Sequence, residues 1–399
     1  MHERPVDILL FLAVVALLTL GSIMVFSAGA VYAQQKHGAY TYFLVRQAFY
    51  LSLGGIAMWR LARIDFGRLR KYAPSLVAGS LALLVAVLFV GARINGARRW
   101  FRLGPLSFQP AEVAKLALVV FLAHSLAKQA QKLGRSPLAF IPQFAIASVL
   151  MGLVLLQPDL GTAAILGFTT IAVLFVSGAR MSYLCIAVLA AAPVAWKHLA
   201  GTPWRLKRVV AFVDPWPFRR DIGYQITESL ISVGSGGTYG MGLGDGRQKL
   251  FFLPEAHTDF ILSILCEELG FVGLCCVVAL FGLLVWRGLR AAWGARDAFG
   301  TYLAFGITML FASQALINIG VVLGSLPTKG LTLPFVSYGG SSLVVTMAMA
   351  GVLLNISRRS PAPIGPDLTE SQREPLWRRL FRARTSRNRA VGRQVVIES

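Results

Sequence analysis

Long apolar runs recur along almost the whole chain, and they restrict it to one class of fold. Each run holds about the twenty residues that a helix needs to cross a bilayer. Lipid offers the backbone no hydrogen-bonding partner, so only helices and closed barrels span it. The runs are continuous rather than alternating, which predicts helices. We expect ten spans, at residues 8–30, 42–62, 73–91, 109–127, 138–156, 161–178, 181–199, 258–285, 299–323 and 336–356.

The composition supports an all-α membrane protein. Of the 399 residues, 56% are hydrophobic and only 14% are charged, whereas soluble domains are about a quarter charged. The formal net charge of +21 fits basic loops beside anionic lipid, and no nucleic-acid motif accompanies it. The four cysteines lie within predicted spans and the histidines are scattered, so the sequence predicts neither disulfides nor a metal site.

The distribution of basic residues predicts the orientation. If the N-terminus is cytoplasmic, the inner loops carry twelve basic residues and the short outer loops carry six. Basic residues favour the cytoplasmic side, so we place both termini there. Residues 1–357 then form one ten-helix domain, and residues 358–399 form a basic cytoplasmic tail that we expect to be disordered.

One long outer segment, residues 200–257, separates the seventh and eighth spans. Its glycine-rich run GSGGTYGMGLGDG follows no strand and precedes no Lys-Ser/Thr pair, which excludes a phosphate-binding loop. The preceding stretch, YQITESLISVG, has helical spacing of Ile226, Leu230 and Val233, which predicts a helix along the membrane interface. We expect the segment to form a flexible, partly helical lid over an outward-facing cavity.

The next stretch, FFLPEAHTDFILSILCEELG, concentrates acids at the mouth of an apolar helix. Carboxylates within a membrane are costly and usually functional. At Asp259 the helix N-terminus and nearby cations favour the charged form, whereas desolvation favours the neutral acid. This opposition produces a base of useful pKa. The alternative is that Asp259 caps the helix, a role that Thr258 could also fill.

Three further polar groups lie on the predicted outer side. Four arginines crowd GARINGARRWFRLG, against the positive-inside rule, which indicates an anionic ligand or contact with lipid headgroups. Glu112 and Lys115 share a helix face and form either a structural ion pair or part of a polar pocket. Asp159, in QPDLGTA, is expected to cap the sixth span.

The segment SLPTKGLTLPFVSYGGSS, between the last two spans, is too long for a simple turn. We expect an ordered or re-entrant loop, because non-helical backbone at membrane depth is tolerated only within protein or around a cavity. Its one charge is Lys329. The outer side thereby gathers four polar patches, at residues 95–115, 157–162, 248–268 and 325–342.

The motifs in these patches resemble those of the SEDS family (shape, elongation, division and sporulation proteins). The matching sequences are NGARRW, FQPAEVAKL, QPDLGTA, LPEAHTDFI with EELG, and LPTKGLTLPFVSYGGSS. They are closer to the cell-division branch than to the elongation branch, and the sporulation branch stays an alternative. The resemblance implies a SEDS-type membrane domain and a peptidoglycan glycosyltransferase. Such an enzyme polymerises lipid II at the outer face of the bacterial cytoplasmic (inner) membrane, here at the division septum.

The resemblance also implies roles for individual residues. The family's catalytic aspartate corresponds to Asp259, its ion pair to Glu112 and Lys115, and its last-loop lysine to Lys329. A family position that is often arginine is Ser107 here, which leaves the other outer arginines as candidates to meet the pyrophosphate. Substrate contacts are predicted for Arg98, Arg99, Arg102, Gln109, Glu112, Lys115, Asp159, Lys249, Glu255, His257, Lys329, Ser337 and Ser341.

The implied reaction is a single displacement. An α-linked donor that gives a β(1→4) product requires inversion, hence one general base, Asp259, with cations stabilising the pyrophosphate leaving group. The sequence indicates no particular cofactor, and it leaves open whether the reaction uses a divalent cation. The implied partners are lipid II, the nascent glycan strand, membrane lipid, a class B penicillin-binding transpeptidase and other divisome proteins.

Two other functions suit the sequence less well. A lipid II flippase or transporter would place its polar residues near the midplane between repeats, whereas here they gather on the outer side. A non-catalytic scaffold for a transpeptidase would not require buried acids. Polymerisation of labelled lipid II by the purified protein distinguishes these functions.

Overall fold

The computed structural model of the protein describes residues 6–94, 96–104, 106–129, 140–201, 207, 210–328 and 330–358. A helix lies in each predicted span, which confirms the all-α class. These helices are α1 (Ile8–His37), α2 (Tyr42–Arg63), α3 (Gly67–Val90), α4 (Pro110–Gln129), α5 (Ile141–Leu156), α6 (Leu160–Val176), α7 (Met181–Ala200), α10 (Ile261–Trp293), α11 (Ala298–Val322) and α12 (Gly340–Arg358).

Not all of these helices have the length and hydropathy of a membrane span. In the part of the chain that is described, six do: α1, α3, α4, α10, α11 and α12. Helices α5, α6 and α7 are apolar over shorter stretches, and α2 carries three arginines. Ten membrane crossings therefore stay a prediction. Of the predicted tail, residues 358–399, the structure describes only Arg358, which is the last residue of α12.

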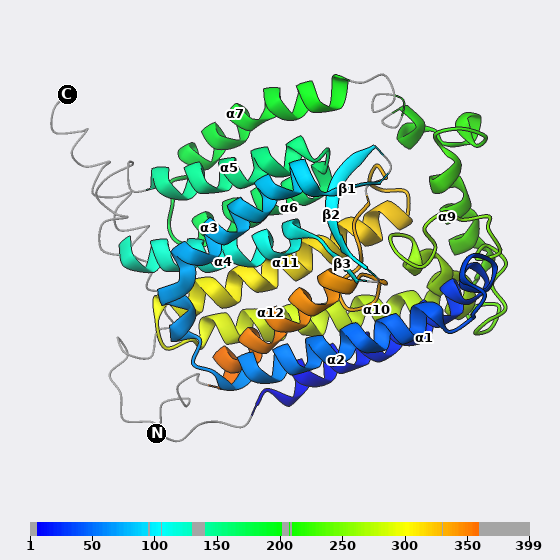
Figure 1. The fold of residues 1–399 in the computed structure, drawn as a ribbon, viewed down its shortest axis with the longest axis horizontal. Helices are drawn as coiled ribbons and strands as arrows, with labels where there is room; N and C mark the ends of the chain where they lie inside the picture. The colour runs from blue at the N-terminus through cyan, green and yellow to red at the C-terminus, as the bar shows by residue number, and fades with distance from the viewer. Residues whose placement is uncertain are drawn as a thin grey trace, which may run out of the picture.

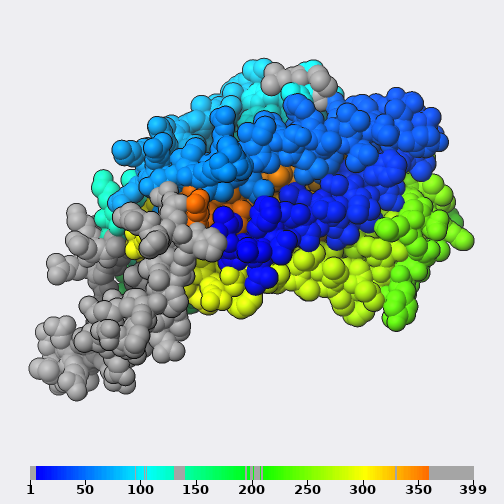
Figure 2. Space-filling model, turned by 90° about the horizontal axis from the view of Figure 1, so that it is seen from below, coloured from blue at the N-terminus to red at the C-terminus, as the bar shows by residue number. Residues whose placement is uncertain are grey.

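The helices form one bundle in which consecutive members run in opposite directions (Figure 1). Helix α12 is buried along nearly its whole length and packs against α2, α4, α10 and α11. Helices α1 and α2 cover one face side by side (Figure 2), and α7 packs against α6 at an edge. Large apolar side chains such as Phe89, Leu189 and Phe271 are exposed on the bundle, as expected of a surface that faces lipid.

A small sheet and the long outer segment occupy one end of the bundle (Figure 1). Strands β1 (Ala92–Ile94), β2 (Ala97–Leu103) and β3 (Leu106–Phe108) connect α3 to α4 in an antiparallel sheet of order β1-β2-β3. The outer segment contributes the short helix η2 (Trp216–Phe218) and helix α9 (Tyr224–Ser235). The three strands had no counterpart among the sequence predictions, because β1 and β3 have only three residues each and the seven residues of β2, ARRWFRL, do not alternate in hydropathy.

Helix α9 packs by a polar face. Its residues Ser229 and Ser232 are fully buried against α10, where their hydroxyls bond the hydroxyl of Ser263 at 2.7 Å and its carbonyl oxygen at 2.9 Å. Of the apolar positions that predicted the helix, Ile226 is buried, whereas Leu230 is only half-buried. Small hydroxyl residues allow helices to approach closely and to bond across the contact, so the serines decide how this helix docks.

Helix α10 is interrupted at Gly270, whose φ of 67° and ψ of −161° are not helical. The backbone of residues 237–242 fills the break. Two N–H groups of this run donate to the last carbonyls before the break, at 2.9 and 3.1 Å, and two of its carbonyls accept from the first N–H groups after it, also at 2.9 and 3.1 Å. The run thereby satisfies backbone groups that an interrupted helix would leave unpaired.

This contact corrects the prediction of a flexible lid for the glycine-rich run. A Cβ atom at Gly240 would overlap the carbonyl oxygen of Glu268, and one at Gly270 would overlap the backbone of Gly240. Gly240 and Gly270 therefore permit a close approach of two backbone segments. The run docks into α10, and only the helical part of the prediction for this segment is confirmed.

The loop between α11 and α12 enters the bundle, as its length predicted. Its residues Leu333, Phe335 and Val336 are buried although they are not helical. The backbone of residues 335 and 336 lies against Gly21, in the middle of α1, with no room for a side chain there. Such non-helical backbone is tolerated because protein surrounds it.

Candidate active site

The backbone around Asp259 is fixed to the last loop. Asp259 lies in the turn before α10, and its carbonyl oxygen accepts a hydrogen bond of 2.8 Å from the side-chain amide of Asn318, which also donates to the carbonyl of Leu331 at 2.7 Å. Two residues earlier, the carbonyl of His257 accepts from the N–H of Tyr338 at 3.1 Å. The predicted convergence of these two patches is therefore observed.

The Asp259 carboxylate does not cap a helix. Helix α10 begins at Ile261, with Phe260 in the capping position and no side-chain cap. This excludes the alternative that Asp259 is the helix cap. It excludes the same role for Thr258, whose hydroxyl instead donates to the Glu255 carboxylate at 2.9 Å. A structural use for the Asp259 carboxylate is therefore missing among its described contacts.

The surroundings of Asp259 make it a base near neutral pH. The side chain is half-buried, and a Cβ atom at Gly330 would lie 3.0 Å from its Oδ2 atom. Burial, the largest cause, and the nearby carboxylates of Glu255 and Asp159 raise the pKa of Asp259 to about 7, against the opposing charge of Arg99. A group that exchanges its proton near pH 7 suits general base catalysis.

The predicted arginines separate in the structure. Arg99 donates to the carbonyls of Gln157 and Pro158 at 2.7 and 2.6 Å, which joins β2 to the turn before α6. Arg98, next along the strand, points elsewhere and donates to the carbonyls of residues 88 and 89 at the end of α3, where a cation is favourable. Arg102 is exposed, with Lys36 nearby. Of the three, only Arg99 acts on the charge of Asp259.

Asp159 caps α6 as predicted. Its Oδ1 accepts from the N–H of Thr162 at 3.0 Å, and its Oδ2 accepts from the hydroxyl of the same residue at 2.8 Å. The cap also brings a second carboxylate to the side of Asp259 on which Arg99 lies. One turn of chain, residues 157–159, therefore supplies both a helix cap and part of the electrostatics of the site.

Aromatic rings surround His257. Its imidazole lies 4.5 Å from the ring of Phe43 and 5.5 Å from that of Tyr32, between ring centroids, and Tyr338 is 5.9 Å away. Burial lowers the pKa of His257, so its ring is neutral at neutral pH. Glu255 is exposed beside it. Sequence analysis missed these aromatic residues and Asn318, because nothing in their local sequence indicates which distant segment they touch.

The Glu112–Lys115 pair forms as predicted. The carboxylate and ammonium groups lie 2.7 Å apart near the start of α4, with side chains only 7% and 1% exposed. Nearby, the N–H of Gln109 donates to the hydroxyl of Ser341 at 3.0 Å, which joins the starts of α4 and α12. The hydroxyl of Ser337 accepts from the N–H of Leu333 at 2.8 Å and stabilises a turn of the last loop.

Lys249 and two acids of α10, Glu267 and Glu268, form an anchor for the outer segment. Lys249 Nζ lies 2.6 Å from the buried Glu268 carboxylate and 3.0 Å from the hydroxyl of Ser27 in α1. Glu267 accepts from the N–H groups of Arg247 and Gln248, at 2.8 and 3.2 Å. These contacts occupy both carboxylates and the ammonium group of Lys249, which the sequence analysis had predicted to contact the substrate. Lys249 therefore lies in a structural ion pair and not among the residues around Asp259.

Two predictions concern groups that the structure does not place. Lys329 lies outside the described residues, although its neighbour Gly330 adjoins Asp259. Over the described ranges, the structure brings together no set of three His, Cys, Asp or Glu side chains that could hold a metal ion.

The chain is similar to known proteins over most of its length. Residues 8–361 match the family model of FtsW, RodA and SpoVE, described as "Cell cycle protein". A "Probable peptidoglycan glycosyltransferase FtsW" of Geobacter metallireducens is 44% identical over 88% of this chain and 95% of its own. The "Stage V sporulation protein E" of Bacillus subtilis is 42% identical over 89% of this chain and 97% of its own.

Solved structures have the same fold. One, described as "Structural coordination of polymerization and crosslinking by a peptidoglycan synthase complex", has a TM-score of 0.72 at 34% identity over 88% of this chain and 98% of that one. The rod shape determining protein RodA of Thermus thermophilus has a TM-score of 0.66 at 32% identity over 89% of this chain and 98% of that one.

Proposed function

The chain belongs to the cell cycle protein family of FtsW, RodA and SpoVE, and from this membership we propose that it is a peptidoglycan glycosyltransferase that polymerises lipid II. The observation that carries the proposal for its site is the half-buried carboxylate of Asp259. It has a pKa raised to about 7, under the influence of Asp159 at the start of α6 and of Arg99 in β2, and it adjoins Gly330 of the last loop. No helix cap or described ion pair uses this carboxylate.

The reaction that this site supports is an inverting displacement. The C4 hydroxyl of the acceptor GlcNAc attacks the anomeric carbon of the donor sugar and gives its proton to Asp259. The new C–O bond forms as the bond from the anomeric carbon to pyrophosphate breaks, and the electron pair leaves with the polyprenyl pyrophosphate. A hydroxyl is a poor nucleophile, and a positioned base accelerates its attack by about 10²–10⁴-fold.

Cations near the site would stabilise the leaving pyrophosphate. Arg99 is the best placed of the arginines, because its charge already acts on Asp259. We assign Arg98 to the end of α3 on its described contacts. Arg102, Lys115 and Lys329 remain proposed contacts of the pyrophosphate or of the sugars beside it.

Neutralising the arginines one at a time tests this assignment. We expect Arg99→Gln to weaken lipid II affinity more than it lowers thermal stability, whereas Arg98→Gln should mainly lower stability. Equal lipid II affinity in the wild type and in all three variants, Arg102→Gln included, would move the pyrophosphate site to Lys115 or Lys329.

The partner and the location belong to the same proposal. Its apolar helices make the chain a multi-pass membrane protein, and one of its structural neighbours comes from a synthase complex that couples polymerisation to crosslinking. We propose that it works with a class B penicillin-binding transpeptidase in the cytoplasmic membrane of the dividing cell, with both termini inside. The similar identities to FtsW and to the sporulation protein leave the branch to be tested by where the protein localises.

Incubation of the purified full-length protein with labelled lipid II, with and without its transpeptidase, tests the activity. We expect glycan strands that a muramidase digests to disaccharide units. Translocation of lipid II across vesicle membranes without any polymer would overturn the proposal in favour of a flippase.

A further inference from the structure

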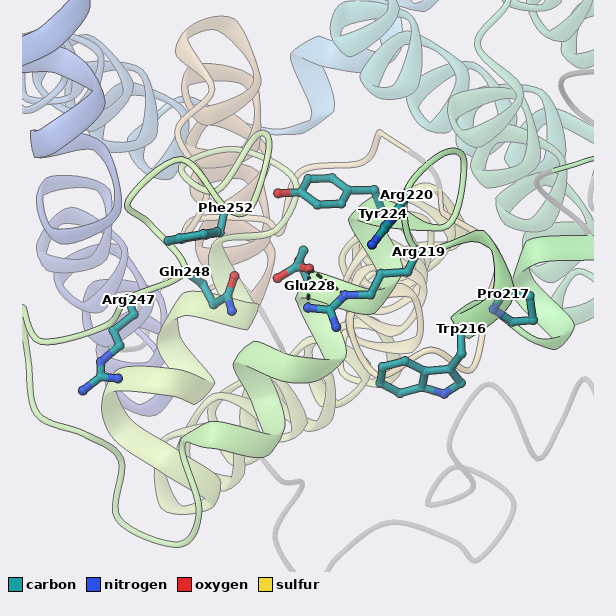
Figure 3. A pocket seen from close by; sticks show the side chains of 9 residues that line it. All are labelled: Trp216, Pro217, Arg219, Arg220, Tyr224, Glu228, Arg247, Gln248 and Phe252. Carbon is teal, nitrogen blue, oxygen red and sulfur yellow. Dashed lines mark hydrogen bonds and ion pairs between the residues drawn. The ribbon is translucent and has the colours of Figure 1, made fainter.

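A cavity lined by charged and aromatic side chains lies in the outer segment, and Asp259 is not among its lining residues. It has a volume of about 940 Å³ and lies between residues 216–228, which include η2 and part of α9, and residues 247–252 (Figure 3). We propose that this cavity binds the nascent glycan strand through the carboxylates of its stem peptides and the faces of its sugar rings. The inference rests on the proposed function and names a binding site for its product.

The charge of the cavity suits an anionic ligand. Three arginines line it, at positions 219, 220 and 247, together with one acid, Glu228. Arg219 is paired with the buried Glu228 carboxylate at 3.2 Å, and Figure 3 shows its guanidinium reaching toward that group. Among the described residues, none pairs with the guanidinium groups of Arg220 and Arg247. Two arginines are therefore available to a carboxylate, which guanidinium groups bind in bidentate fashion.

The walls of the cavity suit a sugar. The side-chain oxygen of Gln248 is buried and has no hydrogen-bonding partner among the described residues, and a buried acceptor left unpaired is costly. A ligand hydroxyl would satisfy it. Trp216, Tyr224 and Phe252 contribute aromatic rings to the lining, and aromatic walls with a few polar groups are typical of small-ligand sites. Pyranose rings offer both hydroxyls and apolar faces.

One wall of the cavity is anchored to α10 and lies close in sequence to Asp259. The N–H groups of Arg247 and Gln248 donate to Glu267 of α10, and the N–H of Leu253 donates to the carbonyl of Gln248 at 2.9 Å. The same short stretch of chain then leads to Asp259. The cavity and Asp259 therefore belong to the same outer end of the bundle, where a growing strand would emerge.

The direct test is binding of purified peptidoglycan strands that retain their stem peptides to the full-length protein in detergent. We expect the double variant Arg220→Gln/Arg247→Gln to bind strands at least about tenfold more weakly, because hydrogen bonds to charged groups are the strong ones. Strands without stem peptides should bind weakly to both proteins. In the polymerisation assay the variant should make shorter strands than the wild type.

The double variant Arg290→Gln/Arg296→Gln is the matched control, because both arginines are exposed at or just beyond the opposite end of α10 and their loss changes the charge equally. Equal strand binding by wild type and double variant would overturn the inference, as would an equal loss in the control. Retained strand binding with loss of the transpeptidase complex would assign the cavity to a protein partner instead. Strand binding requires no turnover, so wild-type protein that binds strands without polymerising lipid II would refute the proposed activity alone.

Discussion

The Asp259 carboxylate shows how single residues of this site acquire their properties from distant segments. Its pKa rises through burial and through Glu255 and Asp159, and it is restrained by Arg99. These residues come from the outer segment, the start of α6 and strand β2. Together these effects place the pKa of Asp259 near physiological pH. There a large fraction of the carboxylate is unprotonated, and it still binds a proton strongly enough to act as a base.

Asp259→Asn should remove polymerisation and leave the fold intact. The isosteric amide cannot accept the proton, so we expect the rate to fall by about 10²–10⁴-fold, measured with labelled lipid II. The folded state favours the protonated acid, so ionisation of Asp259 lowers the stability of the wild type, and this loss is complete above about pH 7. The variant should therefore be at least as heat-stable as the wild type at pH 8. Asp245→Asn, at an exposed site in the same outer segment, should keep full activity.

The pH dependence of kcat/KM should report this environment. We expect the rate to rise with pH through about 7 and then to level off, because only the unprotonated carboxylate accepts the proton. Glu255→Gln removes a carboxylate that raises the pKa and should move the rise to lower pH, whereas Arg99→Gln should move it to higher pH. Shifts of both variants in the same direction would contradict the arrangement.

The Glu112–Lys115 pair should be sensitive to the loss of one partner. Lys115→Ala leaves a buried carboxylate unpaired, which costs about 3–5 kcal/mol in such pairs, and we expect a matching drop in thermal stability and no polymerisation. Replacing both residues, as Glu112→Leu/Lys115→Met, should restore stability but not activity. Full activity in that double variant would make the pair purely structural.

At the scale of elements, the interrupted helix α10 explains much of the outer segment. The break at Gly270 accepts the backbone of residues 237–242, Glu267 binds the N–H groups that follow, and Glu268 pairs with Lys249. Helix α9 docks beside them through its serines. The first turns of α10 therefore anchor residues 237–249 of the outer segment, and this segment leads directly into Asp259.

Gly240→Ala should disrupt that contact. The new Cβ atom would overlap the carbonyl oxygen of Glu268, and φ at this position is 84°, a conformation that costs a side chain of order 1–3 kcal/mol. We expect a lower midpoint of thermal unfolding in detergent and lower activity. Gly234→Ala is the control, because a Cβ atom there meets nothing within 4 Å. Equal stability of the two variants would show that the run does not depend on the close approach.

At the scale of the whole molecule, the polar motifs meet at one end of an apolar bundle. Hydrogen bonds connect the outer sheet to the turn before α6, the start of α4 to the start of α12, and the turn before α10 to the last loop. No single segment builds the site. The bundle brings its parts together because alternate ends of consecutive helices face the same side.

The orientation of the bundle is open to direct measurement. In a cysteine-free background, Tyr239→Cys, at a position that is 84% exposed in the outer segment, should react with a membrane-impermeant maleimide added to spheroplasts. Lys71→Cys, exposed near the start of α3 at the opposite end, should react only after lysis. The reverse pattern would contradict the cytoplasmic placement of the termini.

Local sequence determined the helices and several of their details. A helix fills each predicted span, and Asp159 caps α6 because a cap depends on residues three apart. The Glu112–Lys115 pair forms because its members share one face of one helix. The long last loop is ordered within the protein, as its length and position in the membrane required. Each of these features depends on neighbours in sequence, and so on information that the chain shows directly.

Only the tertiary structure decided which segments touch. The arginines of β2 divide between the end of α3 and the turn before α6 according to the side of the strand on which each lies. The glycine-rich run docks into α10, and Lys249 pairs with Glu268, because backbone and charge buried at that contact must find partners. Hydropathy records that a residue is buried but not against what, because packing depends on shapes and charges contributed by residues far away in the sequence.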